Sequence, residues 1–202
     1  MGVFALSNKL KARRLSNRIP APKGQTLSQD HTLSLSTVTA VMNAPIEKVN
    51  IADWLLNLPD REYQRCSSAH FAAGSTTTDD GRPMSINVET IGDALMVQHY
   101  IAEVHTPSYC KMVSISDSIT AAGRSKAQVI WELRATRIDD ETTEYSNHIH
   151  ASALDETLEF FKQHNISFES AAAARQSASD AHNKEETPNF AKSIERHALS
   201  GR

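Results

Sequence analysis

The feature that most constrains this chain is a block of strand-like segments between residues 64 and 151. Runs rich in β-branched and aromatic residues alternate there with turn signals such as Gly92-Asp93 and Asp139-Asp140-Glu141. A two-residue loop of the Gly92-Asp93 type is typical of β-hairpins. Strands at this spacing indicate an antiparallel meander, and consecutive strands of this kind curl around a core or a cavity.

Further elements precede the block. Residues 32–42 are rich in β-branched side chains and predict a first strand. Pro45 suits the first turn of a helix, and the apolar stripe that follows predicts a helix that ends at Pro59. The chain therefore enters the block through a strand and a helix.

Helical segments follow the block. Asp155 begins a helix that contains Phe160 and Phe161, and the tail over residues 167–198 contains a second predicted helix from Thr187 onward. In that helix Thr187 is expected to be the N-cap and Pro188 the first helical residue. Strands followed by helices indicate an α+β fold. The expected organisation is a flexible basic arm over residues 1–30, a domain over 31–165 and a helical extension over 166–202.

Composition and charge exclude several classes of protein. With 40% hydrophobic and 22% charged residues, the chain has the composition of a soluble globular protein. The net charge is −3, but residues 1–30 carry about +5, so the rest of the chain is negative. A negative body argues against nucleic acid as a partner. No run approaches 18 apolar residues, which excludes a transmembrane helix.

The two cysteines give a weak indication of compartment. Cys66 and Cys110 lie in predicted strands without a CxxC spacing, and they are interpreted as reduced thiols of a cytoplasmic protein.

The hairpin closed by Gly92-Asp93 has a defined register, because its loop pairs Ile91 with Ala94 and side chains then alternate between two faces. The nearly apolar face is expected to point inward; it holds Met84, Ile86, Val88, Thr90, Leu95, Val97, His99, Ile101 and Glu103. The opposite face holds Ser85, Asn87, Glu89, Met96, Gln98 and Tyr100.

His99 and Glu103 are the ionisable residues of this expected inner face. They lie four residues apart on one strand, about 13 Å, and so do not hydrogen-bond to each other. An inward histidine near a carboxylate is suited to general acid/base catalysis. The alternative is a core-edge histidine satisfied by a hydroxyl or carbonyl, with Glu103 at the cavity rim.

His148 and His150 form an HxH pair, a spacing that places two imidazoles on one face of a strand, as metal sites require. Their face also holds Glu144 and Ser146, which favours solvent-exposed histidines. No metal and no cofactor is therefore expected.

The order of these elements resembles that of the START-like, helix-grip superfamily, also called SRPBCC or polyketide cyclase-like. Residues 38–54 (containing NAPIEKVNIADW) resemble its first strand entering a helix, and residues 128–139 resemble its long late strand. Ser146-Asn147, leading into residues 155–161, resembles its last strand and final helix. The chain departs from the pattern at residues 60–65, which leave little room for a second short helix, and at the tail, which Pro188 interrupts.

The resemblance implies a curved antiparallel sheet of six to seven strands around a C-terminal helix, with an apolar cavity between them. Members bind lipids, sterols, plant hormones or polyketides, and some catalyse cyclisation or dehydration. The first hypothesis is binding of an apolar or amphipathic small molecule, such as a lipid, polyketide or aromatic compound. The expected ligand-binding residues are Ile86, Val88, Val97, Ile101, Tyr100, Trp131, Asn147 and Phe161.

Two other functions stay open. One is an enzyme on the same scaffold, a cyclase, dehydratase or isomerase with His99 as general base and Glu103 as the residue that orients it. The other is a non-enzymatic interaction subunit whose basic arm and charged tail are the functional parts. Whether the chain is an enzyme, and whether it forms a homodimer, is not decided by the sequence.

Overall fold

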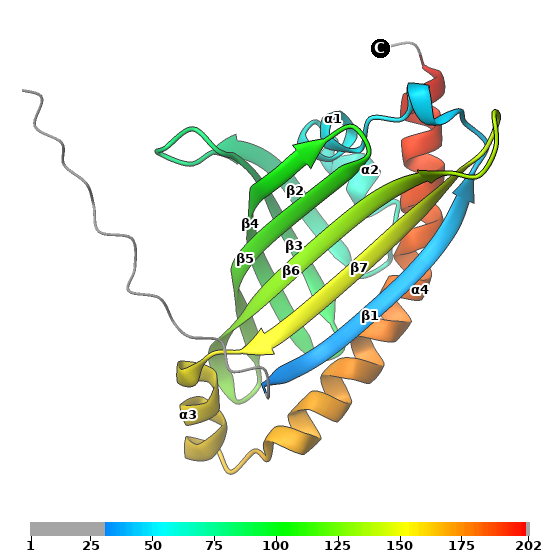
Figure 1. Ribbon diagram of the computed structural model, residues 1–202. Helices are drawn as coiled ribbons and strands as arrows, with labels where there is room; N and C mark the ends of the chain where they lie inside the picture. The colour runs from blue at the N-terminus through cyan, green and yellow to red at the C-terminus, as the bar shows by residue number, and fades with distance from the viewer. Residues whose placement is uncertain (1–30, 201–202) are drawn as a thin grey trace, which may run out of the picture.

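A computed structural model describes residues 31–200 and shows a seven-stranded antiparallel sheet curved around one long helix (Figure 1). The strands are β1 (Thr32–Met42), β2 (His70–Thr77), β3 (Pro83–Ile91), β4 (Ala94–Thr106), β5 (Tyr109–Thr120), β6 (Gly123–Arg137) and β7 (Thr143–Ala153). They lie in the order β1-β7-β6-β5-β4-β3-β2, so β2 to β7 form the expected meander and β1 joins its end. The predicted basic arm, residues 1–30, lies outside the described residues.

In the part of the chain that the structure describes, four helices and one 3₁₀ turn accompany the sheet: η1 (Ile46–Lys48), α1 (Ile51–Leu56), α2 (Asp60–Gln64), α3 (Asp155–Gln163) and α4 (Phe168–Leu199). The single helix predicted after Pro45 is thus a 3₁₀ turn followed by α1, whose N-cap Asn50 accepts a hydrogen bond from the backbone N–H of Asp53 at 3.0 Å. The expectation that residues 60–65 leave little room for a second short helix is wrong, because α2 forms there and buries Tyr63.

Helix α4 corrects the prediction for the tail. It continues through Pro188 for 32 residues, and Phe190, Ala191 and Ile194 lie in the hydrophobic core. Pro188 lies on the exposed side of α4. A proline has no N–H, so the backbone carbonyl four residues earlier, at Lys184, has no helical partner. Lys184 is itself exposed, so this carbonyl lies on the solvent side of the helix. Helix α4 therefore contributes side chains to the same hydrophobic core as the sheet.

The outer edge of β1 is covered by α4, which runs along that strand (Figure 1). The Gln176 side chain accepts a hydrogen bond from the Leu35 N–H at 2.9 Å and donates one to the Leu35 carbonyl at 3.0 Å. Ser179 donates to Ser34, and Asn183 donates to Ser36. These side chains form hydrogen bonds with backbone and hydroxyl groups of β1 that an uncovered edge strand would leave exposed.

The β3–β4 hairpin has the predicted register but the opposite orientation. Ile91 pairs with Ala94 and Ile86 with His99, as expected. However, the more polar face points inward: Ser85, Asn87, Glu89, Met96, Gln98 and Tyr100 are buried. The prediction was wrong because the concave side of the hairpin faces the polar side of α4, where Glu89 pairs with His182. Within residues 31–200, no helix is long and apolar enough to cross a membrane.

Candidate functional site

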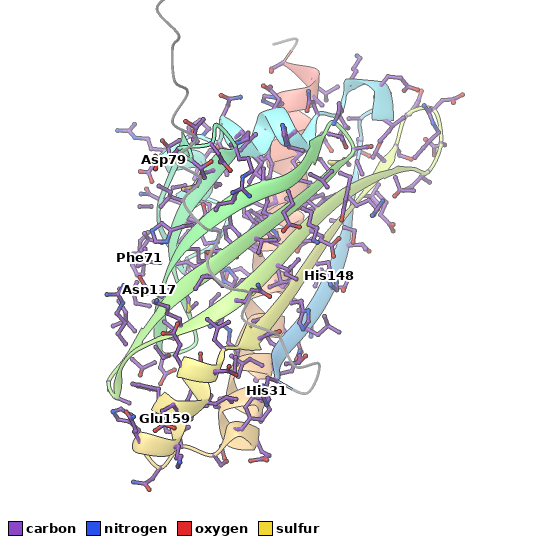
Figure 2. The ribbon with its side chains drawn as sticks, turned by 60° about the vertical axis from the view of Figure 1, so that its left-hand side comes forward. His31, Phe71, Asp79, Asp117, His148 and Glu159 are labelled. Atoms are coloured by element: carbon purple, nitrogen blue, oxygen red, sulfur yellow. The ribbon has the colours of Figure 1, made fainter. Side chains whose placement is uncertain are left out.

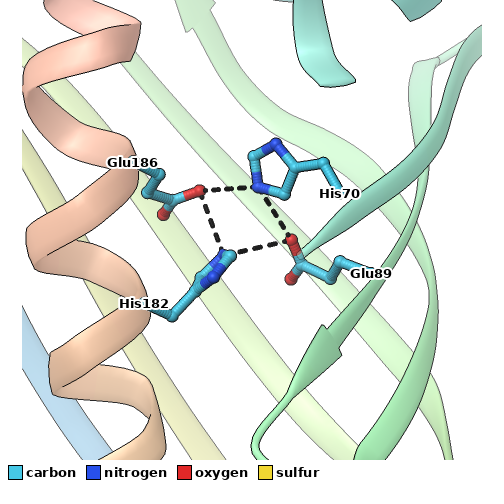
Figure 3. Close-up of side chains that lie close together, drawn as sticks. All are labelled: His70, Glu89, His182 and Glu186. Carbon is cyan, nitrogen blue, oxygen red and sulfur yellow. Dashed lines mark hydrogen bonds and ion pairs between the residues drawn. The ribbon is translucent and has the colours of Figure 1, made fainter. Parts of the chain in front are cut away.

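A cluster of four ionisable side chains lies inside the curved sheet. His70 begins β2, Glu89 lies near the end of β3, and His182 and Glu186 are one turn apart on α4 (Figure 3). All four residues are buried. We call them the His₂Glu₂ cluster.

The four side chains converge through one atom each. Nε2 of His70 lies 3.2 Å from Oε2 of Glu186 and 3.3 Å from Oε2 of Glu89. Nε2 of His182 lies 3.3 Å from each of the same two oxygens. The four ligand-type atoms lie within 4.8 Å of one another. The arrangement is a compact ring in which imidazole nitrogens and carboxylate oxygens alternate.

Neighbouring groups hold the cluster in place. Nδ1 of His70 donates a hydrogen bond to the backbone carbonyl of Tyr63 at 2.7 Å, and the Tyr63 hydroxyl donates to Oε2 of Glu89 at 2.8 Å. The rings of Tyr63 and His70 stack with centroids 3.8 Å apart. On the sheet side, Asn147 donates to Oε1 of Glu186 at 3.0 Å and accepts from Nε1 of Trp131 at 2.7 Å.

The charges of the cluster balance when both imidazoles are protonated. Burial favours neutral imidazoles, but the bonds to Glu186 and Glu89 outweigh it and raise the pKa of His70 to about 9. In the same way, burial is outweighed by the negative charge of Glu186, and the pKa of His182 rises to about 11. Burial disfavours the carboxylate form of Glu89, but the two histidines lower its pKa. Two positive and two negative groups then share one buried space.

A cavity of about 640 Å³ lies at one end of the molecule, between the first turns of α4, helix α3 and the tips of the β3–β4 and β5–β6 hairpins. Its lining is mainly apolar, with Leu33, Ile91, Ala127, Phe161, Ile166 and Ala178 among the lining residues. This volume is in the range of small-molecule sites in proteins.

Two cationic side chains line this cavity and differ in their surroundings. Lys126 forms an ion pair with Glu156 at 3.5 Å. Arg175 instead places Nη1 3.1 Å from the sulfur of Met96, and its Nε is shielded from solvent without a hydrogen-bond partner. Among the described residues, no carboxylate forms an ion pair with Arg175. Burial lowers the pKa of Arg175, and the negative charge of Glu89 opposes that effect.

The predicted site residues are divided between the two faces of the sheet. Tyr100, Trp131 and Asn147 are buried on the concave side, where Tyr100 and Trp131 pack with ring centroids 5.2 Å apart, and Phe161 lines the cavity. The prediction of an inward orientation is wrong for the other six: Ile86, Val88, Val97, Ile101, His99 and Glu103.

His99 and Glu103 therefore do not form part of an internal site. Both are exposed on the outer face, where Glu103 forms an ion pair with Lys111 at 2.9 Å. The HxH pair is also on the outer face, as its polar neighbours suggested. His148 and His150 bond to the hydroxyls of Thr37 and Thr32, and Figure 2 shows His148 pointing away from α4.

The residues that the sequence analysis missed are the members of the His₂Glu₂ cluster and Arg175. Glu89 was assigned to the outer face, and His70 carried no motif. The one local signal was the spacing of His182 and Glu186, which lie four residues apart and so share a face if the segment is helical. That signal was lost because Pro188 was expected to begin the helix.

Comparisons with known proteins support the fold. No protein-family model and no curated protein sequence matches the chain. Among solved structures, the aromatase/cyclase ZhuI from Streptomyces sp. R1128 aligns with a TM-score of 0.55 at 10% identity, over 83% of this chain and 97% of that one. The chain has the START-like helix-grip fold. At this identity the likeness shows the START-like fold alone.

Other solved structures align with lower TM-scores. A START superfamily protein from Mycobacterium smegmatis aligns with a TM-score of 0.41 at 11% identity, over 65% of this chain and 93% of that one. A conserved protein from Geobacillus kaustophilus aligns with a TM-score of 0.45 at 12% identity, over 82% and 95%. Neither of these two alignments adds to the argument for the START-like fold, which depends on the topology and the ZhuI alignment.

Proposed function

We propose that this protein binds an amphipathic small molecule with an anionic group, in the cavity between α3, α4 and the hairpin tips. The observation that carries the proposal is the combination of a mainly apolar cavity with Arg175, a lining cation that has no carboxylate partner among the described residues. The solved structures with the same fold include the aromatase/cyclase ZhuI. His99, which the enzyme hypothesis used as general base, is exposed on the outer face of the sheet and does not line this cavity.

The two parts of the cavity suit the two parts of such a ligand. The apolar lining favours a hydrocarbon or aromatic body, at roughly 25 cal/mol per Å² of apolar surface removed from water. Arg175 offers planar N–H donors that match a carboxylate or phosphate. The Nε of Arg175 has no hydrogen-bond partner, which is unfavourable for a charged group, and an anionic ligand group beside the guanidinium would stabilise its charge.

A pair of probes that differ in charge tests the proposal. Decanoate and 1-decanol share one chain length, and each can be measured by displacement of the neutral fluorescent probe N-phenyl-1-naphthylamine. We expect the wild-type protein to bind decanoate about 10- to 100-fold more tightly than decanol, because a hydrogen bond to a charged group contributes roughly 1.5–3 kcal/mol. Arg175→Gln should abolish this preference and leave decanol affinity unchanged.

The matched control is Lys126→Gln, because Lys126 lines the same cavity but already has Glu156 as a partner. It should keep the preference for decanoate. Equal affinities of the wild-type protein for the two probes would refute the proposal, as would a loss of preference in Lys126→Gln as large as that in Arg175→Gln. Native mass spectrometry of the protein purified from its own host would then identify the natural ligand.

A further inference from the structure

The His₂Glu₂ cluster has a geometry that ion pairing alone does not explain. Each carboxylate presents one oxygen, Oε2, to both imidazoles, and each imidazole presents Nε2 to both carboxylates (Figure 3). All four atoms therefore face a common centre. We propose that His70, Glu89, His182 and Glu186 bind one divalent transition-metal ion. This goes beyond ligand binding in the cavity and does not depend on it.

The distances fit such an ion without movement of the backbone. Zinc binds histidine nitrogen and carboxylate oxygen at about 2.0–2.2 Å, and ligands at the corners of a regular tetrahedron of that size are about 3.4 Å apart. The four nitrogen–oxygen distances in the cluster are 3.2, 3.3, 3.3 and 3.3 Å. A cation at the centre lies about 2.0 Å from each atom if the four form a tetrahedron with these edges, and about 2.3 Å if they form a square.

The histidines supply an independent observation. Nε2 of His182 is buried and has hydrogen-bond geometry to neither carboxylate, although both oxygens lie 3.3 Å away. For His70, the carbonyl of Tyr63 can only accept, so Nδ1 carries a proton, and Nε2, which bonds to Glu186 at 3.2 Å, is the nitrogen that would bind a metal once its own proton is lost.

The surrounding contacts are those that orient metal ligands. Ligating histidines commonly donate their other N–H to a backbone carbonyl, as His70 does to Tyr63, and ligating carboxylates accept further hydrogen bonds. Glu89 accepts from the Tyr63 hydroxyl and Glu186 from Asn147. A divalent cation with two neutral imidazoles and two carboxylates has zero net charge, so it can replace the two imidazolium protons without leaving a buried charge.

The mixed nitrogen and oxygen ligand set indicates the class of metal. Imidazole favours zinc, iron, nickel and copper over magnesium or calcium. The ion would join α4 to β2 and β3, at one edge of the sheet. At the other edge, Gln176 and Ser179 already bond α4 to β1. The bound ion would therefore cross-link the long helix to the β2 edge of the sheet.

Cobalt(II) is the probe for this site, because tetrahedral cobalt absorbs strongly in the visible range. The wild-type protein is stripped with chelator, and Co²⁺ is added both to the folded protein and during refolding, since the cluster is buried. We expect one Co²⁺ per chain with tetrahedral absorption bands, displacement by Zn²⁺, and a thermal midpoint that rises with Co²⁺ concentration. No uptake by either route would overturn the proposal and leave the cluster as two ion pairs.

Variants separate this site from other histidines. Glu89→Gln and His182→Ala should each weaken Co²⁺ binding by at least about 100-fold, more than the 10–100-fold typical of residues that only support ligands. The control is the double variant His148→Ala/His150→Ala, which removes the outer HxH pair and should bind Co²⁺ as the wild type does. Binding that depends on the outer pair instead would also overturn the proposal. If the ligand variants fail to fold, the Co²⁺ spectrum and midpoint shift of the wild type decide the question.

Discussion

Asn147 links the sheet, the core and the buried cluster through one side chain. Its amide oxygen accepts from Trp131, and its amide nitrogen donates to Oε1 of Glu186 and, at 3.2 Å, to the hydroxyl of Thr187. Its backbone carbonyl also accepts from Asn183 on α4. All of these groups are buried. Because solvent does not reach these groups, the partners of the Asn147 amide would be left without hydrogen bonds if the amide were removed.

Asn147→Leu should lower the free energy of unfolding by about 2–5 kcal/mol, because it leaves the Trp131 N–H and a Glu186 oxygen without partners. Guanidinium-induced unfolding followed by fluorescence measures the change. Ser146→Ala, the neighbouring position on the outer face, is the control and should stay within about 0.5 kcal/mol of wild type. A similarly small change in Asn147→Leu would show that the hydrogen-bond network contributes little to stability.

At the scale of elements, α4 is both a core helix and a polar one. Its buried residues are Ser179, His182, Asn183, Glu186, Thr187, Phe190, Ala191, Ser193 and Ile194, which recur at helical spacing on one face. Phe190 is the large apolar member of this face and packs near Trp54, Tyr63, His70 and Trp131. The helix is therefore anchored by one aromatic side chain within a network of hydrogen bonds.

Phe190→Ala should destabilise the protein by about 3–5 kcal/mol, since it removes a fully buried aromatic ring and leaves a cavity beside the cluster. Leu199→Ala is the control, because Leu199 lies on the same helix with 52% of its surface exposed, and it should change stability by less than about 0.5 kcal/mol. Equal effects of the two substitutions in denaturant unfolding would contradict a core position for α4.

The strands could be predicted from sequence because their signals are local. The Gly92-Asp93 loop fixes the hairpin register, and the strand predicted over residues 32–42 matches β1. Local periodicity separates the two faces of a strand but does not say which one is inside. The apolar face of Ile86 and Val97 was therefore expected inside, whereas the partner that decides the matter, α4, lies about a hundred residues further along the chain.

The candidate site was not predictable for the same physical reason. Its residues come from β2, β3 and α4, and they meet only after the sheet has curved around the helix. The stripe on α4 holds serine, histidine, asparagine, glutamate and threonine, so a search for apolar periodicity finds Phe190 and Ile194 and misses the rest. Asn147 and Trp131 were selected on the resemblance and the strand pattern, and both contact the cluster network.

At the scale of the whole molecule, the two ends of the domain differ in construction. The buried residues of α4 begin at Ser179, whereas none of residues 168–178 is buried, although several line the cavity. The first third of α4 therefore lines the cavity with half-buried and exposed side chains, whereas the remainder is held by the His₂Glu₂ cluster and the core. Regions with few buried contacts open at lower free energy than the rest of a domain.

Hydrogen exchange measured by mass spectrometry should show this division within one continuous helix. We expect amides in residues 168–178 to exchange at least roughly tenfold faster than those in residues 179–194, because they open without global unfolding. Decanoate at saturating concentration should slow exchange in residues 168–178, where Arg175 and Ala178 line the cavity, and leave residues 179–194 unchanged. Uniform protection along α4, with no response to decanoate, would mean that the helix opens as one unit and that the cavity end is not where ligands enter.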